Sequence, residues 1–304
     1  MHGLMVIDKP EDWTSHDVVN KVRRFVGTRR VGHLGTLDPI ATGVLPLLVG
    51  NATRLAQYFK RAEKTYEAVV RFGFSTDTFD RAGAATSPEV PVNLDRAILE
   101  AALEKFRGHI WQMPPDYSAK KIGGTAAYKL ARKQMPVTIP PIEVDIFELT
   151  VLDMQSPYVT LRAHCSAGTY IRSIAHDLGV ALGYGAHLHQ LRRTQSGDFR
   201  ISQAITLSRL EELASAGRVT EALLPAADLL PEFPAVYVED STAAQIRNGH
   251  EFHVSPFRVK NESRYVKALS DEGELLAIGE AILPNVYRPV VVFPLHVGEA
   301  EVSA

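Results

Sequence analysis

The 304-residue sequence predicts an α+β protein in which helices and strands are mixed along the chain. Segments with the helical period of 3.6 residues alternate with segments whose every second residue is apolar, the pattern of a half-buried strand. The sequence pattern changes near residue 231. There the proline-containing segment LLPEFPAV is followed by short β-like runs between turn residues. We therefore expect two domains, residues 1–230 and a small, mostly β domain at 231–304.

The first elements along the chain are a strand and a capped helix. The strand is expected at residues 4–8. Thr14 and Asp17 then have the spacing of a capping box, which satisfies backbone donors at the start of a helix. The helix that follows has one apolar face, made of Val18, Val19, Val22, Phe25 and Val26. A second short helix is expected after Asn51, whose side chain can act as its N-cap.

A strand and a helix are expected in the middle of the first domain. Residues 64–73, KTYEAVVRFG, place Tyr66, Ala68, Val70 and Phe72 on one side, which predicts a strand. The segment NLDRAILEAALEKFRG predicts a helix capped by Asn93 and ended by Gly108. Its apolar face is expected to hold Leu94, Ile98, Ala102 and Phe106.

The rest of the first domain is predicted as an arm, a hairpin and a helix. Residues 111–141 are basic and bounded by prolines, a composition that suits a mobile arm better than a core element. Residues 142–154 and 158–166 are β-rich runs joined by QSPY, which predicts a hairpin. The run GTYIRSIAHDLGVALG predicts a helix from near Thr169 to Gly183.

Composition excludes several classes of protein. The chain has no apolar run long enough to span a membrane, and its first residues lack the pattern of a signal peptide, so we expect a cytoplasmic protein. Its single cysteine, Cys165, excludes an internal disulfide and a multi-thiolate metal site. The sequence also contains no P-loop, no G-x-S-x-G elbow and no H-E-x-x-H motif. Carboxylate chemistry, an aromatic pocket or plain binding remain.

Charge is segregated along the chain although the net charge is only −2. Residues 1–72, 105–135 and 162–200 are basic, and the middle segment holds 7 basic side chains against 1 acidic. If these segments meet on one face, they form a surface for a polyanion such as RNA. The alternative is a set of ordinary solvated faces of alternating sign.

Two short motifs could carry chemistry. The stretch GHLGTLDPIATGVLP holds one carboxylate, Asp38, before Pro39, which favours an extended backbone and a side chain presented at a turn. From spacing alone, an ordinary turn explains that motif better than a functional site does. The motif GTYIR places Tyr170 and Arg172 two residues apart, which would separate them on a regular helix, so both can line one pocket only at the start of the helix.

Five separated blocks, in order, resemble the bacterial TruB-type tRNA pseudouridine synthases. The resemblance spans about residues 3–230, and the blocks are GLMVIDKP, VGHLGTLDPIATGVLPLLVGNATRL, KTYEAVVRFGFSTDTFD, FRGHIWQMPPDYSAKK, and CSAGTYIRSIAHDLG through AHLHQLRRTQSGDF. It implies a pseudouridine synthase fold, with a central, mostly antiparallel sheet flanked by helices. The last domain is more loosely similar to the PUA-like domain that ends many members.

The resemblance implies a role for individual residues. Asp38 matches the catalytic aspartate, Arg172 its arginine partner and Tyr66 the tyrosine that stacks on the target base. The other matches are substrate-binding positions: Tyr170 and Leu191 in the uridine pocket, His33 in the space left by the flipped nucleotide, and Lys9 near the site. Asp12 stands where the family usually has glycine, which questions the tightness of that turn.

The implied activity is isomerisation of uridine 55 in the tRNA T loop to pseudouridine, without a cofactor. The expected partner is the T stem-loop of tRNA, with no membrane and no metal, and the expected state is a monomer. Two alternatives remain. One is an RNA-binding or tRNA-folding protein that needs no catalysis, and the other is a guide-RNA-dependent pseudouridine synthase subunit, disfavoured because the chain lacks extended basic tails.

Overall fold

The computed structural model describes residues 1–115, 121–122, 125–126, 139–255 and 263–294. Its main sheet has 11 strands: β1 (Gly3–Lys9), β2 (Val31–His33), β3 (Ala41–Val49), β4 (Lys64–Phe72), β5 (Gly108–Gln112), β8 (Ile142–Gln155), β9 (Tyr158–Cys165), β10 (Ala186–Ser196), β11 (Phe199–Arg200), β12 (Ile205–Thr206) and β13 (Leu224–Pro225). The second sheet has five: β14 (Ala235–Tyr237), β15 (Phe252–His253), β16 (Tyr265–Leu269), β17 (Leu275–Leu283) and β18 (Val286–Val292). Strands β6 (Lys121–Ile122) and β7 (Thr125–Ala126) form a two-stranded pair.

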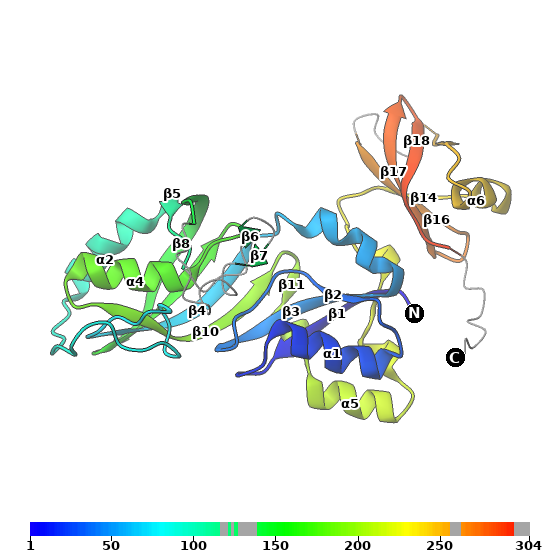
Figure 1. Ribbon diagram of the computed structural model, residues 1–304. Coiled ribbons are helices and arrows are strands. Elements are labelled where there is room, and N and C mark those ends of the chain that lie inside the picture. The colour runs from blue at the N-terminus through cyan, green and yellow to red at the C-terminus, as the bar shows by residue number, and fades with distance from the viewer. Residues whose placement is uncertain (116–120, 123–124, 127–138, 256–262, 295–304) are drawn as a thin grey trace.

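The helices are short and lie beside the main sheet or beside the second one (Figure 1). The α-helices are α1 (Ser15–Val26), α2 (Arg96–Leu103), α4 (Ile171–Leu182), α5 (Leu207–Ser215) and α6 (Asp240–Arg247). The 3-10 helices are η1 (Gly50–Phe59), η2 (Glu104–Phe106), η3 (Ile201–Gln203), η4 (Val219–Ala222) and η5 (Ala226–Asp228). In the part of the chain that the structure describes, no helix has the length and apolarity needed to cross a bilayer.

The main sheet is mostly antiparallel, as predicted, and its central strands position the site. Its principal path runs β12-β1-β3-β10-β4-β9-β8-β5, and the pairs β3–β10 and β1–β12 are parallel. Helices α1 and α5 contact each other at one end of this sheet, and α2 and α4 contact each other at the other end (Figure 1). The central strands β3, β10 and β4 therefore lie between two groups of helices.

Several predicted elements are confirmed. The Thr14–Asp17 capping box starts α1, and Gly27 ends that helix in the left-handed conformation. Strand β4 buries the four predicted residues, Tyr66, Ala68, Val70 and Phe72. The hairpin forms as β8 and β9, and α4 ends at the predicted Gly183.

Other predictions were wrong about which residue caps a helix and which face of the helix is buried. Asn51 lies inside a 3-10 helix rather than at an N-cap, because its side chain accepts a hydrogen bond from Arg30 at 2.7 Å. Asp95, not Asn93, caps α2 by accepting from two backbone amides. Consequently the buried face of that helix carries Leu99 and Leu103, and Ile98 is exposed. Most of the predicted arm, residues 111–141, lies outside the described residues.

The second sheet packs against the main sheet through an apolar cluster. One apolar cluster joins residues of the main sheet, among them Leu4, Val44 and Leu48, to residues of the second, among them Leu275 and Ile278. A separate cluster lies between α6 and the second sheet. Residues from 235 onward thus have a core of their own and a shared apolar contact with the rest of the chain.

Candidate active site

The loop between β2 and β3 carries Asp38. It runs over residues 34–40, and both of its ends enter adjacent strands of the main sheet. The amide of Ala41 donates to the Asp38 carbonyl at 3.0 Å, which closes a tight turn around Pro39. The turn therefore holds Asp38 immediately before the central strand β3.

Side chains and backbone of the N-terminal segment hold this loop in place. The buried Ser15 hydroxyl accepts from the Leu37 amide at 2.8 Å and donates to the Leu37 carbonyl at 3.0 Å. The Asp12 amide donates to the Pro39 carbonyl at 2.9 Å. Asp12 itself has a φ of 62°, a left-handed conformation that Asp adopts more readily than most residues. The turn thus forms with Asp where the family usually has glycine.

Arg172 joins Asp38 to a second carboxylate. Its Nε lies 3.0 Å from Oδ2 of Asp38, and one terminal nitrogen lies 3.3 Å from Oδ2 of Asp80. The arginine and Asp80 side chains are only 5% and 8% exposed, whereas that of Asp38 is 35% exposed. Asp80 thus holds the Arg172 guanidinium from the buried side. Of the three side chains, Asp38 is the one that a ligand can reach.

The electrostatic environment of Asp38 contains opposing effects. Burial raises the pKa of its carboxyl, Arg172 and Lys9 lower it, and Asp80 raises it further. The cations therefore favour the charged carboxylate in a site whose apolar walls disfavour it. Burial prevails, so the pKa of Asp38 is raised overall. A partly desolvated carboxylate beside two cations is suited to act as a nucleophile or a base.

Tyr66 and Leu191 line the sheet floor beside the loop. Tyr66 lies on β4 and is 7% exposed; burial raises the pKa of its phenol, and Arg193 counteracts that rise. Leu191 lies on β10, where it pairs with Ala68 of β4 and Ala41 of β3. Both predicted residues therefore lie on the central strands next to Asp38.

Tyr170 occupies the start of α4, the place that its spacing from Arg172 required. It is the N-cap residue, with an extended φ of −100° and ψ of 104°. The Gln112 side chain pairs with its backbone twice, accepting from the amide at 2.7 Å and donating to the carbonyl at 2.9 Å. The extended backbone places Tyr170 outside the regular helix, which is the condition that the sequence set for both residues to line one pocket.

His33 and Lys9 differ in their access to a ligand. His33 ends β2 immediately before the loop and is half-buried, and burial lowers the pKa of its imidazole. Lys9 is 0% exposed, and its ammonium group donates to the carbonyls of Pro10 at 2.8 Å, Trp13 at 2.5 Å and Pro39 at 3.2 Å. Lys9, predicted as a substrate contact, is turned into the protein and supports the loop after Asp38.

Sequence reasoning did not single out Asp80, Gln112 or Arg193. Asp80 lies in the block KTYEAVVRFGFSTDTFD and Gln112 in FRGHIWQMPPDYSAKK, so both were within the resemblance. The available signal for these residues was their polarity inside the blocks that carry the family resemblance. The burial of Asp80 against Arg172 of α4 follows only from the folded chain.

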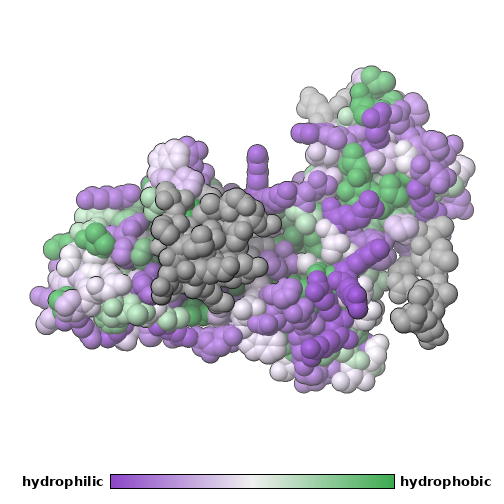
Figure 2. Space-filling model, in the orientation of Figure 1, coloured by the Kyte–Doolittle hydropathy of each residue, from purple (hydrophilic) through white to green (hydrophobic). Residues whose placement is uncertain are grey.

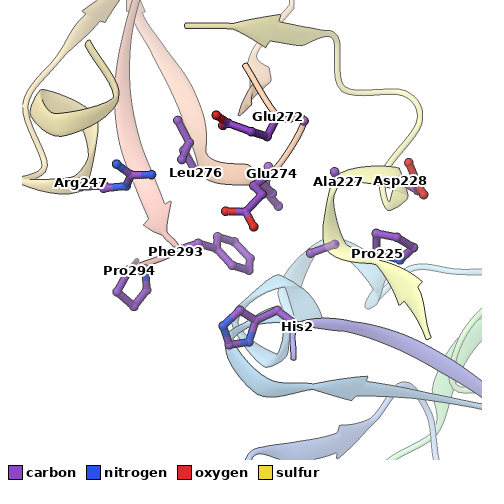
Figure 3. A pocket seen from close by; sticks show the side chains of 13 residues that line it. His2, Pro225, Ala227, Asp228, Arg247, Glu272, Glu274, Leu276, Phe293 and Pro294 are labelled. Atoms are coloured by element: carbon purple, nitrogen blue, oxygen red, sulfur yellow. The ribbon is translucent and has the colours of Figure 1, made fainter. Parts of the chain in front are cut away.

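The structure also contains a cavity that is remote from Asp38. It has a volume of about 410 Å³ and lies where the second sheet meets the first, near His2, Arg247 and Phe293 (Figure 3). Its lining includes the carboxylates of Asp228, Glu272 and Glu274, an excess of acidic over basic groups. This charge disfavours a phosphate-bearing ligand, and none of the predicted site residues lines the cavity.

Comparison with known proteins gives matches along most of the chain. Residues 23–171 match the family model described as TruB family pseudouridylate synthase (N terminal domain), and residues 172–230 match that of the tRNA pseudouridylate synthase B C-terminal domain. The tRNA pseudouridine synthase B of Solibacter usitatus is 59% identical over 292 residues, 96% of this chain and 100% of that protein. The chain belongs to the TruB family. The TruB protein of Thermobifida fusca is 42% identical over 299 residues, 96% of this chain and 98% of that one.

Solved structures place this TruB family member in the pseudouridine synthase fold. A chain of an H/ACA RNP bound to a substrate RNA containing 2'-deoxyuridine superposes with a TM-score of 0.69 at 25% identity, covering 96% of this chain and 85% of that one. A chain of a Cbf5-Nop10-Gar1 complex gives 0.67 at 27% identity, covering 93% and 79%. The protein is thus a TruB-type tRNA pseudouridine synthase, an isomerase with the predicted α+β fold.

Proposed function

We propose that this enzyme converts uridine 55 in the T loop of tRNA to pseudouridine. The observation that carries the proposal is Asp38, a partly exposed carboxylate held at 3.0 Å by a buried arginine that a second buried carboxylate anchors. The family supplies the reaction class, and the geometry supplies one charged group with access to a ligand.

Asp38 is the group that reacts, either as a nucleophile or as a base on the sugar. The N1–C1′ bond breaks, the uracil turns within the site, and a C5–C1′ bond forms, so reactant and product have the same atoms and no cofactor is needed. Arg172 keeps the carboxylate charged and aimed. Tyr66 accepts the proton that leaves C5.

The target uridine must leave the folded loop before it can react. Extrusion of a base costs a few kcal/mol of stacking and pairing. Tyr66 against the flipped base returns about 1–3 kcal/mol. His33 fills the vacated space, and Tyr170 and Leu191 enclose the uridine.

The basic segments form the surface that binds the T stem-loop. Strands β3, β4, β9 and β10 bring parts of residues 1–72 and 162–200 side by side in one sheet. Helix α1 carries Lys21, Arg23 and Arg24, of which Arg24 is exposed and the other two are partly buried. Figure 2 shows a largely hydrophilic surface over this part of the molecule. We expect the affinity for tRNA to fall steeply with salt, by about 0.7–0.9 log units per log unit of salt for each phosphate neutralised. Residues 231–304 act as a PUA-like domain, and the enzyme works as a monomer.

Tritium release tests this function. The purified protein is mixed with a tRNA transcript labelled at C5 of its uridines, and release is compared with that from a transcript in which residue 55 is cytidine. We expect release from the first transcript and none from the second. No release from the first transcript would refute the activity, and equal release from both would refute the choice of uridine 55.

A further inference from the structure

Arg193 is a second arginine of the site, and its side chain is completely buried. It lies on β10 with an exposed fraction of 0%. Its Nε donates to the Val44 carbonyl at 2.7 Å, and a terminal nitrogen donates to the Gly35 carbonyl at 3.1 Å. Gly35 belongs to the loop that carries Asp38, so this guanidinium links the floor of the sheet to the catalytic loop.

The strand register places the same arginine beside Tyr66. Arg193 pairs with Gly43 of β3 on one side and with Tyr66 of β4 on the other. Gly43 has a φ of 98°, and a Cβ there would lie 2.2 Å from the Arg193 carbonyl oxygen. No larger residue fits at that position, so the sheet holds the arginine in a close contact between the two strands.

In the part of the chain that the structure describes, Arg193 donates to neutral backbone acceptors. The two carbonyl oxygens that accept from it carry no formal charge, unlike the carboxylates around Arg172. The effect reaches the neighbouring side chains. Burial lowers the pKa of His33 and Lys64 and the charge of Arg193 lowers it further, whereas burial raises the pKa of Tyr66 and Arg193 opposes that rise. In a dry site such a charge acts more strongly than at the surface.

We propose that Arg193 is a positioning residue that holds the catalytic loop through Gly35 and orients and polarises the Tyr66 phenol for removal of the C5 proton. The inference rests on the proposed function and deepens it. After C5–C1′ bond formation, the C5–H bond breaks and its electron pair forms the C5=C6 double bond. The C6=N1 π pair returns to N1, which takes up a proton, while the phenolate oxygen of Tyr66 receives the proton from C5. The phenol formed in this way then loses a proton to solvent, which regenerates the phenolate.

The charged and titratable groups around this contact define what its removal changes. Tyr66 interacts with Arg193, with the Cys165 thiol of β9 and with the Asp38 carboxylate of the loop. Arg193 interacts in addition with His33 of β2 and Lys64 of β4. Among these, Arg193 is the group whose charge favours the ionised phenol, since burial, Cys165 and Asp38 oppose it.

The test is a hydrogen isotope effect on turnover, measured with a tRNA transcript deuterated at C5 of uridine. We expect kcat of Arg193→Met to fall about 10- to 100-fold, as for the loss of part of an acid–base step. Its isotope effect is expected to rise above that of the wild type, because proton removal becomes slower relative to the other steps. In a Tyr66→Phe background, Arg193→Met should add little to the loss of kcat.

Lys267→Met is the matched control. Lys267 is another buried cation that donates to two carbonyls, those of Ala227 at 2.8 Å and Leu229 at 2.9 Å, but it lies in the second sheet. It should lose stability without a change in isotope effect. An unchanged isotope effect in Arg193→Met, or full additivity with Tyr66→Phe, would overturn the inference.

Two further outcomes are informative. If Arg193→Met does not fold, Arg193→Lys decides: the inference predicts a raised isotope effect, because a lysine cannot hold Gly35 and reach Tyr66 with the same fork. A wild-type value in Arg193→Lys would overturn it. Failure of the wild type to release label from uridine 55 would instead refute the proposed function.

Discussion

Two buried arginines serve this site in different electrostatic settings. Arg172, on α4, lies between the carboxylates of Asp38 and Asp80. Arg193, on β10, donates to the neutral carbonyls of Gly35 and Val44. The comparison teaches that burial of a cation has two uses here: one arginine fixes a negative charge, and the other keeps a positive charge available to its neighbours.

Geometry explains why each arrangement is stable. A buried ion needs either an opposite charge or a full set of hydrogen bonds, because desolvation otherwise costs several kcal/mol. Asp80 is itself held by Thr78 at 2.7 Å and by the Ala82 amide at 2.9 Å, so the partner of Arg172 cannot turn away. The triad of Asp38, Arg172 and Asp80 thus holds one partly exposed carboxylate and one buried carboxylate.

The largest effect in this comparison is expected from Arg172→Lys. A lysine presents one point charge and cannot bind two carboxylates with the arginine's fork, so Asp38 loses its orientation. We expect kcat to fall about 100-fold, the cost of a misplaced catalytic group. Single-turnover measurements on the tRNA transcript check this, and a kcat within twofold of the wild type, roughly 0.4 kcal/mol in barrier height, would contradict the role of the fork.

Asp80→Asn removes the buried charge behind Arg172. Breaking a buried pair leaves a cation without compensation, so we expect a loss of about 3 kcal/mol in the free energy of unfolding. Urea unfolding measures it, and turnover should fall in parallel because Arg172 is freed to shift. Stability equal to that of the wild type would show that Asp80 does not anchor the arginine.

Lys9 gives a pH dependence with a definite sign. Burial lowers the pKa of this lysine from 10.5 to about 8, so between these values the unfolded chain binds the proton and the folded chain does not. The contribution of Lys9 to the free energy of unfolding therefore rises with pH across that window, by at most about 1.4 kcal/mol per pH unit. The same contribution is lost as the pH falls from 10.5 through about 8. Unfolding of Lys9→Met should lack this rise, and identical slopes in both proteins would contradict it.

A surface pair should show the smallest effect. Arg209 and Glu212 lie 2.7 Å apart on α5 with side chains 56% and 65% exposed. Solvent and salt screen such a pair, so Glu212→Gln should change the free energy of unfolding by only about 0.3–0.5 kcal/mol. A loss as large as that of Asp80→Asn in the same urea titration would break the distinction between buried and surface pairs.

Local patterns predicted much of this fold. The capping box at Thr14, the alternation around Tyr66 and the glycine at 183 are each determined by neighbours in sequence, and each was confirmed. Asn93 and Asp95 compete for the same cap two positions apart, and sequence alone does not rank them. Asn51 failed as a cap because its partner, Arg30, is distant in sequence.

The candidate site was predicted in part. Asp38 and Arg172 were paired through the family resemblance, and the structure brings them into contact. Asp80 escaped notice because its burial depends on a loop that folds back onto α4, with Phe79 at a φ of 63°. The direction of the Lys9 side chain likewise depends on carbonyls up to 30 positions away.

Asp38→Asn tests the central claim most directly. The substitution keeps the size of the side chain and removes its charge, and its effect is measured as tritium release and as tRNA binding on the same preparation. The account predicts that release falls by at least about 10³-fold while the affinity for tRNA stays near that of the wild type. Release at the wild-type rate would show that the carboxylate held by Arg172 is not the catalytic group.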